Sequence, residues 1–144
     1  SVLYPGLSKE RFLLEVGDLF RLDQSVFAIS EKRLKDAEEV FLSGKPFSYI
    51  HRVSEFYHHR FYVDERVLIP RPETEFLVDM IVRSGKKYKK LLDVGTGSGV
   101  ILLSLMKAGI AESGTGSDIS SDALDVAKIN QRNLRLNVDL VLSD

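Results

Sequence analysis

Hydrophobic residues in the first 52 positions of the chain recur at helical spacing. Ser8 is a good N-cap for the segment 9–22, whose apolar positions follow at i, i+4, i+7 and i+8. These positions are Phe12, Val16, Leu19 and Phe20. A second helix is predicted after Ser30 and ends at Gly44, because glycine commonly follows the last turn of a helix. We therefore expect a small helical N-terminal domain over residues 1–52.

The next segment, residues 53–66, is rich in aromatic and β-branched residues. In VSEFYHHRFYV, residues 53–63, such residues stand on both sides of His58 and His59, which predicts a short β-hairpin linker. Adjacent histidines on a strand point to opposite faces, and at a turn they diverge. We therefore interpret the pair as turn or surface residues and expect no metal site there.

Strands and helices alternate over the remaining residues, 67–144. The prolines of VLIPRPETE (67–75) impose an extended segment, and a helix then begins at Glu73. This helix carries Phe76, Leu77, Met80 and Ile81. The elements expected next are a strand at 91–94, a helix at 100–107, a strand at about 114–118, a helix at 121–135 and a strand at 138–143. The alternation predicts an α/β fold, namely the first three parallel strands of a Rossmann-like domain with the C-terminal edge open to pairing.

The turn that follows the strand at 91–94 is the main candidate for chemistry. It carries Gly95, Gly97 and Gly99 at alternate positions, and glycine allows both a tight turn and the close approach of a ligand. The dinucleotide spacing GxGxxG would need a glycine where Val100 stands. The turn therefore favours S-adenosylmethionine, which has an adenosine but no pyrophosphate, over a nicotinamide or flavin cofactor.

Two acids at strand ends complete this candidate site. Asp93 ends the first strand, where a negative charge would favour the ammonium and sulfonium groups of the cofactor. Asp118 ends the second strand and is a candidate acceptor for two ribose hydroxyls, since charge-assisted hydrogen bonds are strong and oriented. The alternative for Asp118 is a turn or cap acid.

Composition narrows the class of protein. The 20 basic and 21 acidic residues give a net charge of −1, which argues against non-specific nucleic-acid binding. No apolar run approaches the ~20 residues of a membrane span, so we expect no membrane partner. The chain has no cysteine, hence no disulfide framework or thiolate metal site, and this favours the cytoplasm.

Five segments of the chain are characteristic when taken together. The segments are GKPFSYI, EFYHHRFYV, VLIPRPETE, LLDVGTGSGVI and SDISSDALDVAKIN. Together they resemble the protein-glutamine methyltransferases that modify peptide chain release factors. The resemblance covers roughly residues 8–144, and its most specific part is VLIPRPETE shortly before the glycine turn. The resemblance implies an N-terminal domain that helps to dock the release factor, a hairpin linker and a Rossmann-like catalytic domain over 67–144. It implies that Asp118 binds the ribose and that Asp144 lies beside the adenine. The residues implied to line the cofactor are Gly95, Thr96, Gly97, Ser98 and Gly99.

The chain also departs from this family at three places. Arg52 and His58 stand where glycine is usual, which puts the backbone geometry of the linker in question. The Asn-Pro-Pro-Tyr motif of the family does not occur in the 144 residues, and the resemblance assigns the holding of the substrate amide to that motif. We therefore expect this chain to contain no catalytic residue and to be inactive by itself.

The leading hypothesis is methyl transfer from S-adenosylmethionine to the side-chain amide nitrogen of a glutamine in a release factor. An exocyclic-amine methyltransferase acting on adenine or guanine in nucleic acid is the first alternative, because its target is also a planar amino group. A non-enzymatic binding module is a second alternative. A nicotinamide dehydrogenase is a third, disfavoured by Val100.

Overall fold

The structure, a computed structural model, describes residues 42–143. The chain divides into two compact units, Ser1–Pro46 and Phe47–Asp144. The helix predicted at 9–22, most of the helix predicted after Ser30, and Asp144 lie outside the described residues.

The second unit begins with a short helix and the hairpin. Helix α3 (Phe47–His51) leads directly into strands β1 (Val53–Phe56) and β2 (His59–Tyr62), which pair in antiparallel fashion. The hairpin predicted for 53–63 is thus confirmed, with His58 in its turn and His59 in its second strand. The rings of Phe56 and Phe61 are buried and meet edge to face, with centroids 6.2 Å apart. This aromatic pair gives the hairpin a buried face of its own.

A three-stranded parallel sheet forms the centre of the unit, as the alternation of strands and helices predicts. Its strand order is β3-β4-β5. Helix α4 precedes the sheet, α5 connects β3 to β4, and α6 connects β4 to β5. The bounds are α4 (Pro72–Arg83), β3 (Tyr88–Val94), α5 (Val100–Lys107), β4 (Ala111–Asp118), α6 (Ser121–Asn133) and β5 (Asp139–Leu142). The predicted elements are therefore confirmed, with β3 and β4 each beginning about three residues earlier than expected.

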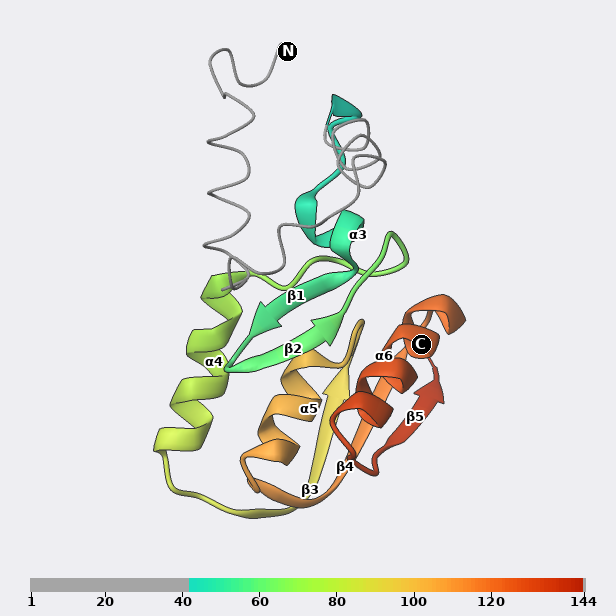
Figure 1. Ribbon diagram of the computed structural model, residues 1–144. Helices are drawn as coiled ribbons and strands as arrows, with labels where there is room; N and C mark the ends of the chain where they lie inside the picture. Colours follow the sequence, from blue (N-terminus) through green and yellow to red (C-terminus); the bar gives the residue numbers. More distant parts are fainter. Residues whose placement is uncertain (1–41, 144) are drawn as a thin grey trace. The chain divides into compact units, whose positions relative to one another are not determined.

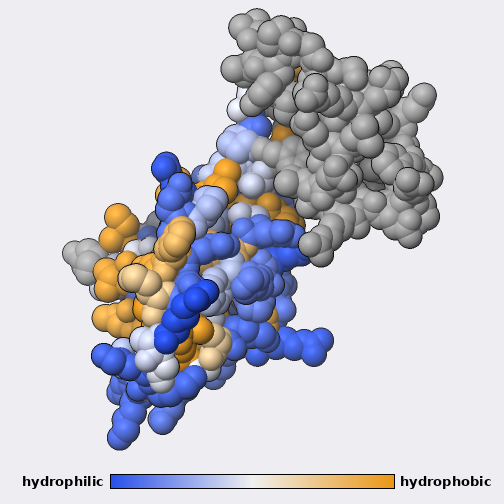
Figure 2. All heavy atoms as spheres, turned by 90° about the vertical axis from the view of Figure 1, so that its left-hand side faces the viewer, coloured by the Kyte–Doolittle hydropathy of each residue, from blue (hydrophilic) through white to orange (hydrophobic). Residues whose placement is uncertain are grey.

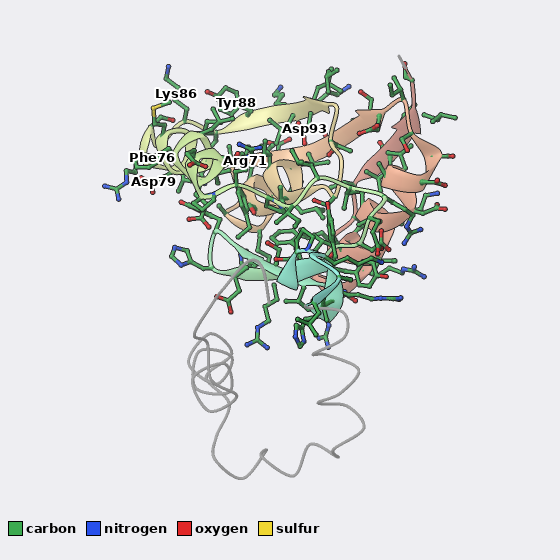
Figure 3. All side chains as sticks on the ribbon, turned by 90° about the horizontal axis from the view of Figure 1, so that it is seen from above. Arg71, Phe76, Asp79, Lys86, Tyr88 and Asp93 are labelled. Carbon is green, nitrogen blue, oxygen red and sulfur yellow. The ribbon has the colours of Figure 1, made fainter. Side chains whose placement is uncertain are left out.

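The three helices lie on one face of the sheet, and the hairpin crosses them on the side away from the strands (Figures 1 and 3). The main core lies between these layers, where α5 is buried on most of its surface. Its buried members are Phe56, Phe61, Val78, Val100, Leu102, Leu103, Leu105, Ile110 and Val138. A smaller cluster joins the residues after the hairpin to α6, and its members are Val63, Val67, Ala123 and Val126.

Several large apolar side chains remain exposed in the described part of the chain. Leu92 and Val94 point to the face of the sheet opposite the helices and are 64% and 75% exposed. On α4, Phe76 and Met80 are 75% and 65% exposed, while Val78 is fully buried. Figure 2, which looks onto the side that carries α4, shows hydrophobic side chains gathered there. Apolar surface is thus left uncovered by residues 42–143 on both α4 and the outer face of the sheet.

Two linker residues, Arg52 and His58, stand where glycine is expected from the family resemblance, and both adopt left-handed backbone. Arg52 has φ 54°, directly after α3. In the hairpin turn, Tyr57 has φ 42° and His58 has φ 66°. Two successive residues with positive φ are the pattern of a type I′ hairpin turn, whose twist matches that of the paired strands. The backbone therefore keeps a glycine-like path at both positions, although the side chains make it less favourable.

A buried acid, Asp64, holds the segment that follows the hairpin in place through hydrogen bonds. The Arg66 guanidinium donates hydrogen bonds to both carboxylate oxygens of Asp64, over 2.7 to 3.1 Å. The Tyr62 hydroxyl donates to Asp64 Oδ2 at 3.0 Å. The hydrogen bonds from the Arg66 side chain lower the pKa of Asp64 from 3.8 to about 2, although burial acts in the opposite direction. Asp64 is therefore ionised in the folded chain at any pH well above this value.

His58→Gly should raise the free energy of unfolding by about 1 kcal/mol, because glycine adopts φ 66° without the steric cost that a Cβ brings. Urea denaturation followed by circular dichroism measures the change. Arg60→Gly, at the exposed position of the neighbouring strand β2, is the control and should lower stability, since glycine weakens a strand interior. A loss of stability in His58→Gly equal to that in the control would contradict the strain argument.

Acid should remove a part of the stability that Asp64 provides. Its pKa in the folded state lies below the unfolded value, so its contribution is complete above about pH 4 and disappears as the pH falls toward about 2. Asp64→Asn should therefore cost more stability at neutral pH than at about pH 2.5. Asp125→Asn, which removes an exposed pair with Lys128, is the control and should cost little stability at either pH. Equal pH dependence in the two variants would count against the prediction.

Candidate functional site

Strands β3 and β4 end side by side, and their last residues form the candidate site. In the parallel register Asp93 pairs with Gly116, and Val94 pairs with Ser117. Asp118 follows one residue later, at the C-terminal end of β4. Both carboxylates therefore lie at the edge of the sheet where ligands bind in open α/β folds. The glycine turn between β3 and α5 lies at the same edge (Figures 1 and 3).

The glycine turn is built on left-handed backbone. Gly95, Gly97 and Gly99 have φ values of 72°, 55° and 82°. A Cβ on Gly97 would meet no atom within 4 Å, so its conformation and not crowding requires glycine there. A Cβ on Gly99 would lie 3.0 Å from Leu103 Cδ1 and 3.4 Å from Ala127 Cβ. Gly99 therefore also permits the close contact between the start of α5 and helix α6.

Asp118 connects the end of β4 to the glycine turn. Its Oδ2 accepts a hydrogen bond from the Gly97 backbone N–H at 2.8 Å, and its Oδ1 accepts one from the Ser120 N–H at 3.0 Å. Ser120 in turn caps α6 by accepting from the Ala123 N–H. Each carboxylate oxygen keeps a further lone pair, because a carboxylate can accept about four hydrogen bonds. The side chain thus shapes the turn and retains the capacity to accept from a ligand.

Asp93 is half-buried and held by the turn. The Thr96 hydroxyl donates to Asp93 Oδ2 at 2.8 Å, and the Thr96 backbone N–H donates to the Ser117 carbonyl at 2.9 Å. Burial, the larger cause, and the negative charge of Asp118 raise the pKa of the Asp93 carboxyl, whereas the hydrogen bond from Thr96 opposes the shift. A cation bound beside both carboxylates would relieve this repulsion. The electrostatics of this edge therefore favour a positively charged ligand group.

Of the eight site residues expected from the sequence, seven are described and come together at this edge. Gly95 is exposed and Gly97 is half-buried, whereas the side chains of Thr96 and Ser98 are buried. Thr96 and Ser98 therefore face the protein interior, and only their backbone is available to line a ligand. Asp144 lies outside the described residues. Among residues 42–143 no group of three or more His, Cys, Asp or Glu side chains could hold a metal ion.

The sequence patterns predict no functional role for Asn130, a residue that contacts the glycine turn. Its side chain is fully buried and donates a hydrogen bond to the Ser98 carbonyl at 2.9 Å. A signal existed in the sequence, because Asn130 continues the apolar stripe of α6. The other buried members of that stripe are Ala123, Leu124, Val126 and Ala127. An amide at such a position needs hydrogen-bond partners, which a helical pattern cannot identify.

Comparison with known proteins agrees with this geometry. The family model described as methyltransferase small domain matches residues 72–144, just over half of the chain. A release factor glutamine methyltransferase of Streptococcus pneumoniae is 43% identical over 128 residues, which are 88% of this chain and 46% of the relative. One from Lactococcus lactis is 41% identical over 138 residues, which are 93% of this chain and 51% of the relative. The chain thus spans about half the length of the curated relatives it matches.

Solved structures agree with the fold. Trm5b from Pyrococcus abyssi matches with a TM-score of 0.57 and 20% identity, over 64% of this chain and 28% of that one. TYW2 from M. jannaschii in complex with AdoMet matches with a TM-score of 0.55 and 16% identity, over 64% of this chain and 42% of that one. At this identity the likeness concerns the fold alone, which is the Rossmann-like α/β fold predicted above. The relatives confirm the resemblance drawn from the motifs, and the family model covers the sheet and the glycine turn, so the chain belongs to the methyltransferase small domain family.

Proposed function

We propose that the glycine turn and the two strand-end carboxylates bind S-adenosylmethionine. The observation that carries the proposal is the pair of hydrogen bonds that Asp118 accepts from Gly97 and Ser120. These bonds hold the carboxylate in one orientation before any ligand arrives, with lone pairs left for two ribose hydroxyls. An acceptor that is already oriented loses little freedom on binding, so its hydrogen bonds contribute more to affinity.

The charges at this edge suit the other end of the same cofactor. Asp93 lies at the C-terminal end of the neighbouring strand, beside the start of α5. Its carboxylate would face the ammonium and sulfonium groups, and the positive end of the helix dipole would favour the cofactor carboxylate. When bound, the cofactor supplies a methyl group already activated by the sulfonium. The residues of this chain orient that donor.

We propose that the acceptor is the side-chain amide nitrogen of a glutamine in a peptide chain release factor. The names of the curated relatives support this choice, because the relatives match 88% and 93% of this chain. An amide nitrogen is a weak nucleophile, so the reaction depends on bringing nitrogen, methyl carbon and sulfur into line. We assign to the described residues the binding of the methyl donor. We assign to none of them the binding of the amide that accepts the methyl group. Such an activity acts on the translation machinery, in the cytoplasm.

No helix among the described residues combines the length and the apolar character that a bilayer crossing requires.

Replacing Asp118 tests the cofactor site. Asp118→Ala removes the acceptor for two ribose hydroxyls and should weaken the binding of S-adenosylmethionine by about a hundredfold or more, since each of the two charge-assisted hydrogen bonds is worth about 1.5 to 3 kcal/mol. Titration calorimetry measures the dissociation constant, and it uses the full-length protein, by which we mean the complete product of its gene. Asp122→Ala, an exposed acid in the first turn of α6, is the control and should bind as the wild type does. Binding by Asp118→Ala within threefold of that control would rule out the proposed ribose contact.

The acceptor is tested by a competition between substrates. The full-length protein should transfer a labelled methyl group to a release factor and not to RNA or DNA under the same conditions. A release factor with the target glutamine replaced by asparagine should remain unlabelled, because its shorter side chain moves the amide out of line. Labelling of nucleic acid instead would favour an exocyclic-amine methyltransferase, and cofactor binding with no methylation of either would favour a binding module.

A further inference from the structure

Asn130 is joined to two distant segments by three hydrogen bonds. Its Oδ1 accepts from the Tyr62 backbone N–H at 2.6 Å, and its Nδ2 donates to the Tyr62 carbonyl at 3.0 Å. The same Nδ2 donates to the Ser98 carbonyl at 2.9 Å. Tyr62 ends strand β2 of the hairpin, and Ser98 lies in the glycine turn. One buried amide therefore connects the hairpin, helix α6 and the glycine turn.

The chemistry of the amide makes this connection specific. An asparagine side chain has two N–H donors and one carbonyl acceptor, and here both donors and the acceptor are used. The three partners also fix the orientation of the amide, because two of them are carbonyl oxygens and the third is an N–H. No similarly sized apolar side chain could replace the contacts, and an aspartate at position 130 would present an oxygen to two carbonyl oxygens.

The bond to Ser98 acts on the part of the turn that faces the ligand. Ser98 lies between Gly97 and Gly99, both of which have left-handed backbone. Gly97 also donates its N–H to Asp118 Oδ2. The peptide that carries the Ser98 carbonyl also carries the Gly99 N–H, which donates to the Thr96 carbonyl at 2.8 Å, and the Thr96 carbonyl shares its peptide with the Gly97 N–H. A displacement of the Ser98 carbonyl would therefore alter the bond between Gly97 and Asp118. The orientation of the proposed ribose acceptor thus depends on a bond made by Asn130.

The opposite end of the hairpin has a separate attachment. The Tyr57 backbone N–H donates to Glu75 Oε1 of α4 at 2.7 Å. This bond holds the turn of the hairpin but involves no residue of the glycine turn. Among the described residues, the hairpin is therefore tied to α4 at one end and to the glycine turn, through Asn130, at the other.

We propose that Asn130 is a positioning residue that couples the linker hairpin to cofactor binding. This inference rests on the proposed function, because it assumes that the glycine turn binds the cofactor. Through Asn130, the position of strand β2 and the geometry of the turn between Gly97 and Gly99 are set together. Cofactor bound at the turn accordingly stabilises the hydrogen bonds of Tyr62, and loss of the amide weakens cofactor binding.

The first test replaces the amide by a carboxylate of the same shape. Asn130→Asp keeps the acceptor for the Tyr62 N–H and removes both donors, so the full-length protein should bind S-adenosylhomocysteine about tenfold more weakly than the wild type. Gln131→Glu is the matched control. Gln131 is the next residue of the same helix and also donates a side-chain N–H to a backbone carbonyl, that of Val138, which lies away from the turn. The control should bind as the wild type does.

The second test uses the wild type and so does not depend on how well a variant folds. Amide hydrogen exchange is followed by NMR with and without S-adenosylhomocysteine. The ligand should slow exchange of the Tyr62 amide, which Asn130 holds, more than exchange of the Tyr57 amide, which Glu75 holds at the other end of the hairpin. Equal slowing of both amides would indicate general stabilisation, and no slowing would indicate independence, and either result overturns the coupling.

The outcomes separate this inference from the proposed function. If the wild-type protein binds no S-adenosylhomocysteine, the proposed cofactor site is wrong and the coupling falls with it. If the wild type binds the ligand and a folded Asn130→Asp binds it within twofold of Gln131→Glu, Asn130 is a structural residue only and the cofactor site stands. If Asn130→Asp does not fold, the exchange of the Tyr62 and Tyr57 amides decides.

Discussion

Helix α5 packs onto strand β4 at two positions where the strand has no side chain, and the geometry of the site depends on this contact. A Cβ on Gly114 would lie 2.9 Å from both Leu102 Cδ1 and Met106 Sδ, and a Cβ on Gly116 would lie 3.0 Å from Leu102 and from the Thr96 side chain. The absence of a side chain at these two positions of β4 lets the helix lie close to the sheet. It also leaves room for Thr96 beneath the turn, where its hydroxyl reaches Asp93. Larger residues at these positions would move the start of α5 and the glycine turn with it.

The candidate site built on this contact is a set of backbone groups held by a few polar side chains. Thr96 orients Asp93, Asp118 holds the Gly97 N–H, and Asn130 holds the Ser98 carbonyl. The buried side chains of Thr96 and Asn130 thus support the turn from the protein interior, while the half-buried Asp118 supports it from the side on which we propose that the cofactor binds. This arrangement explains why glycine is needed at the surface of the turn, and why the polar residues of the same segment are buried.

Much of this architecture could be predicted from the sequence, because it follows from local patterns. The alternation of apolar strands and helices, and the glycines at 95, 97 and 99, identified the sheet and the turn. The aromatic segment around His58 predicted the hairpin, although the left-handed backbone of Tyr57 and His58 is not what such side chains prefer. In these cases the interactions that determine the structure join residues that are only a few positions apart in the sequence.

Other features could not be predicted, because they depend on contacts between distant segments. In the sequence, Asn130 is one polar residue of a predicted helix. Its hydrogen-bond partners, Tyr62 and Ser98, are known only from the structure. The apolar residues of the helix after Glu73 do not reveal which of them are buried, and Phe76 and Met80 prove to be exposed while Val78 is not. Helical periodicity defines an apolar stripe, but the partner of that stripe is a property of the whole fold.

The 68-residue separation between Tyr62 and Asn130 has a consequence for the order of folding. A two-residue turn lets the hairpin close by itself within microseconds, but closing a loop of this length costs on the order of 4 kcal/mol of chain entropy. The three hydrogen bonds of Asn130, at about 1 kcal/mol each, do not offset this cost alone. The packing of Val63 against Ala123 and Val126 must contribute as well. Closure of the hairpin is therefore expected to be faster than its docking onto α6, and the glycine turn can acquire its hydrogen bond to Asn130 only once α6 has formed.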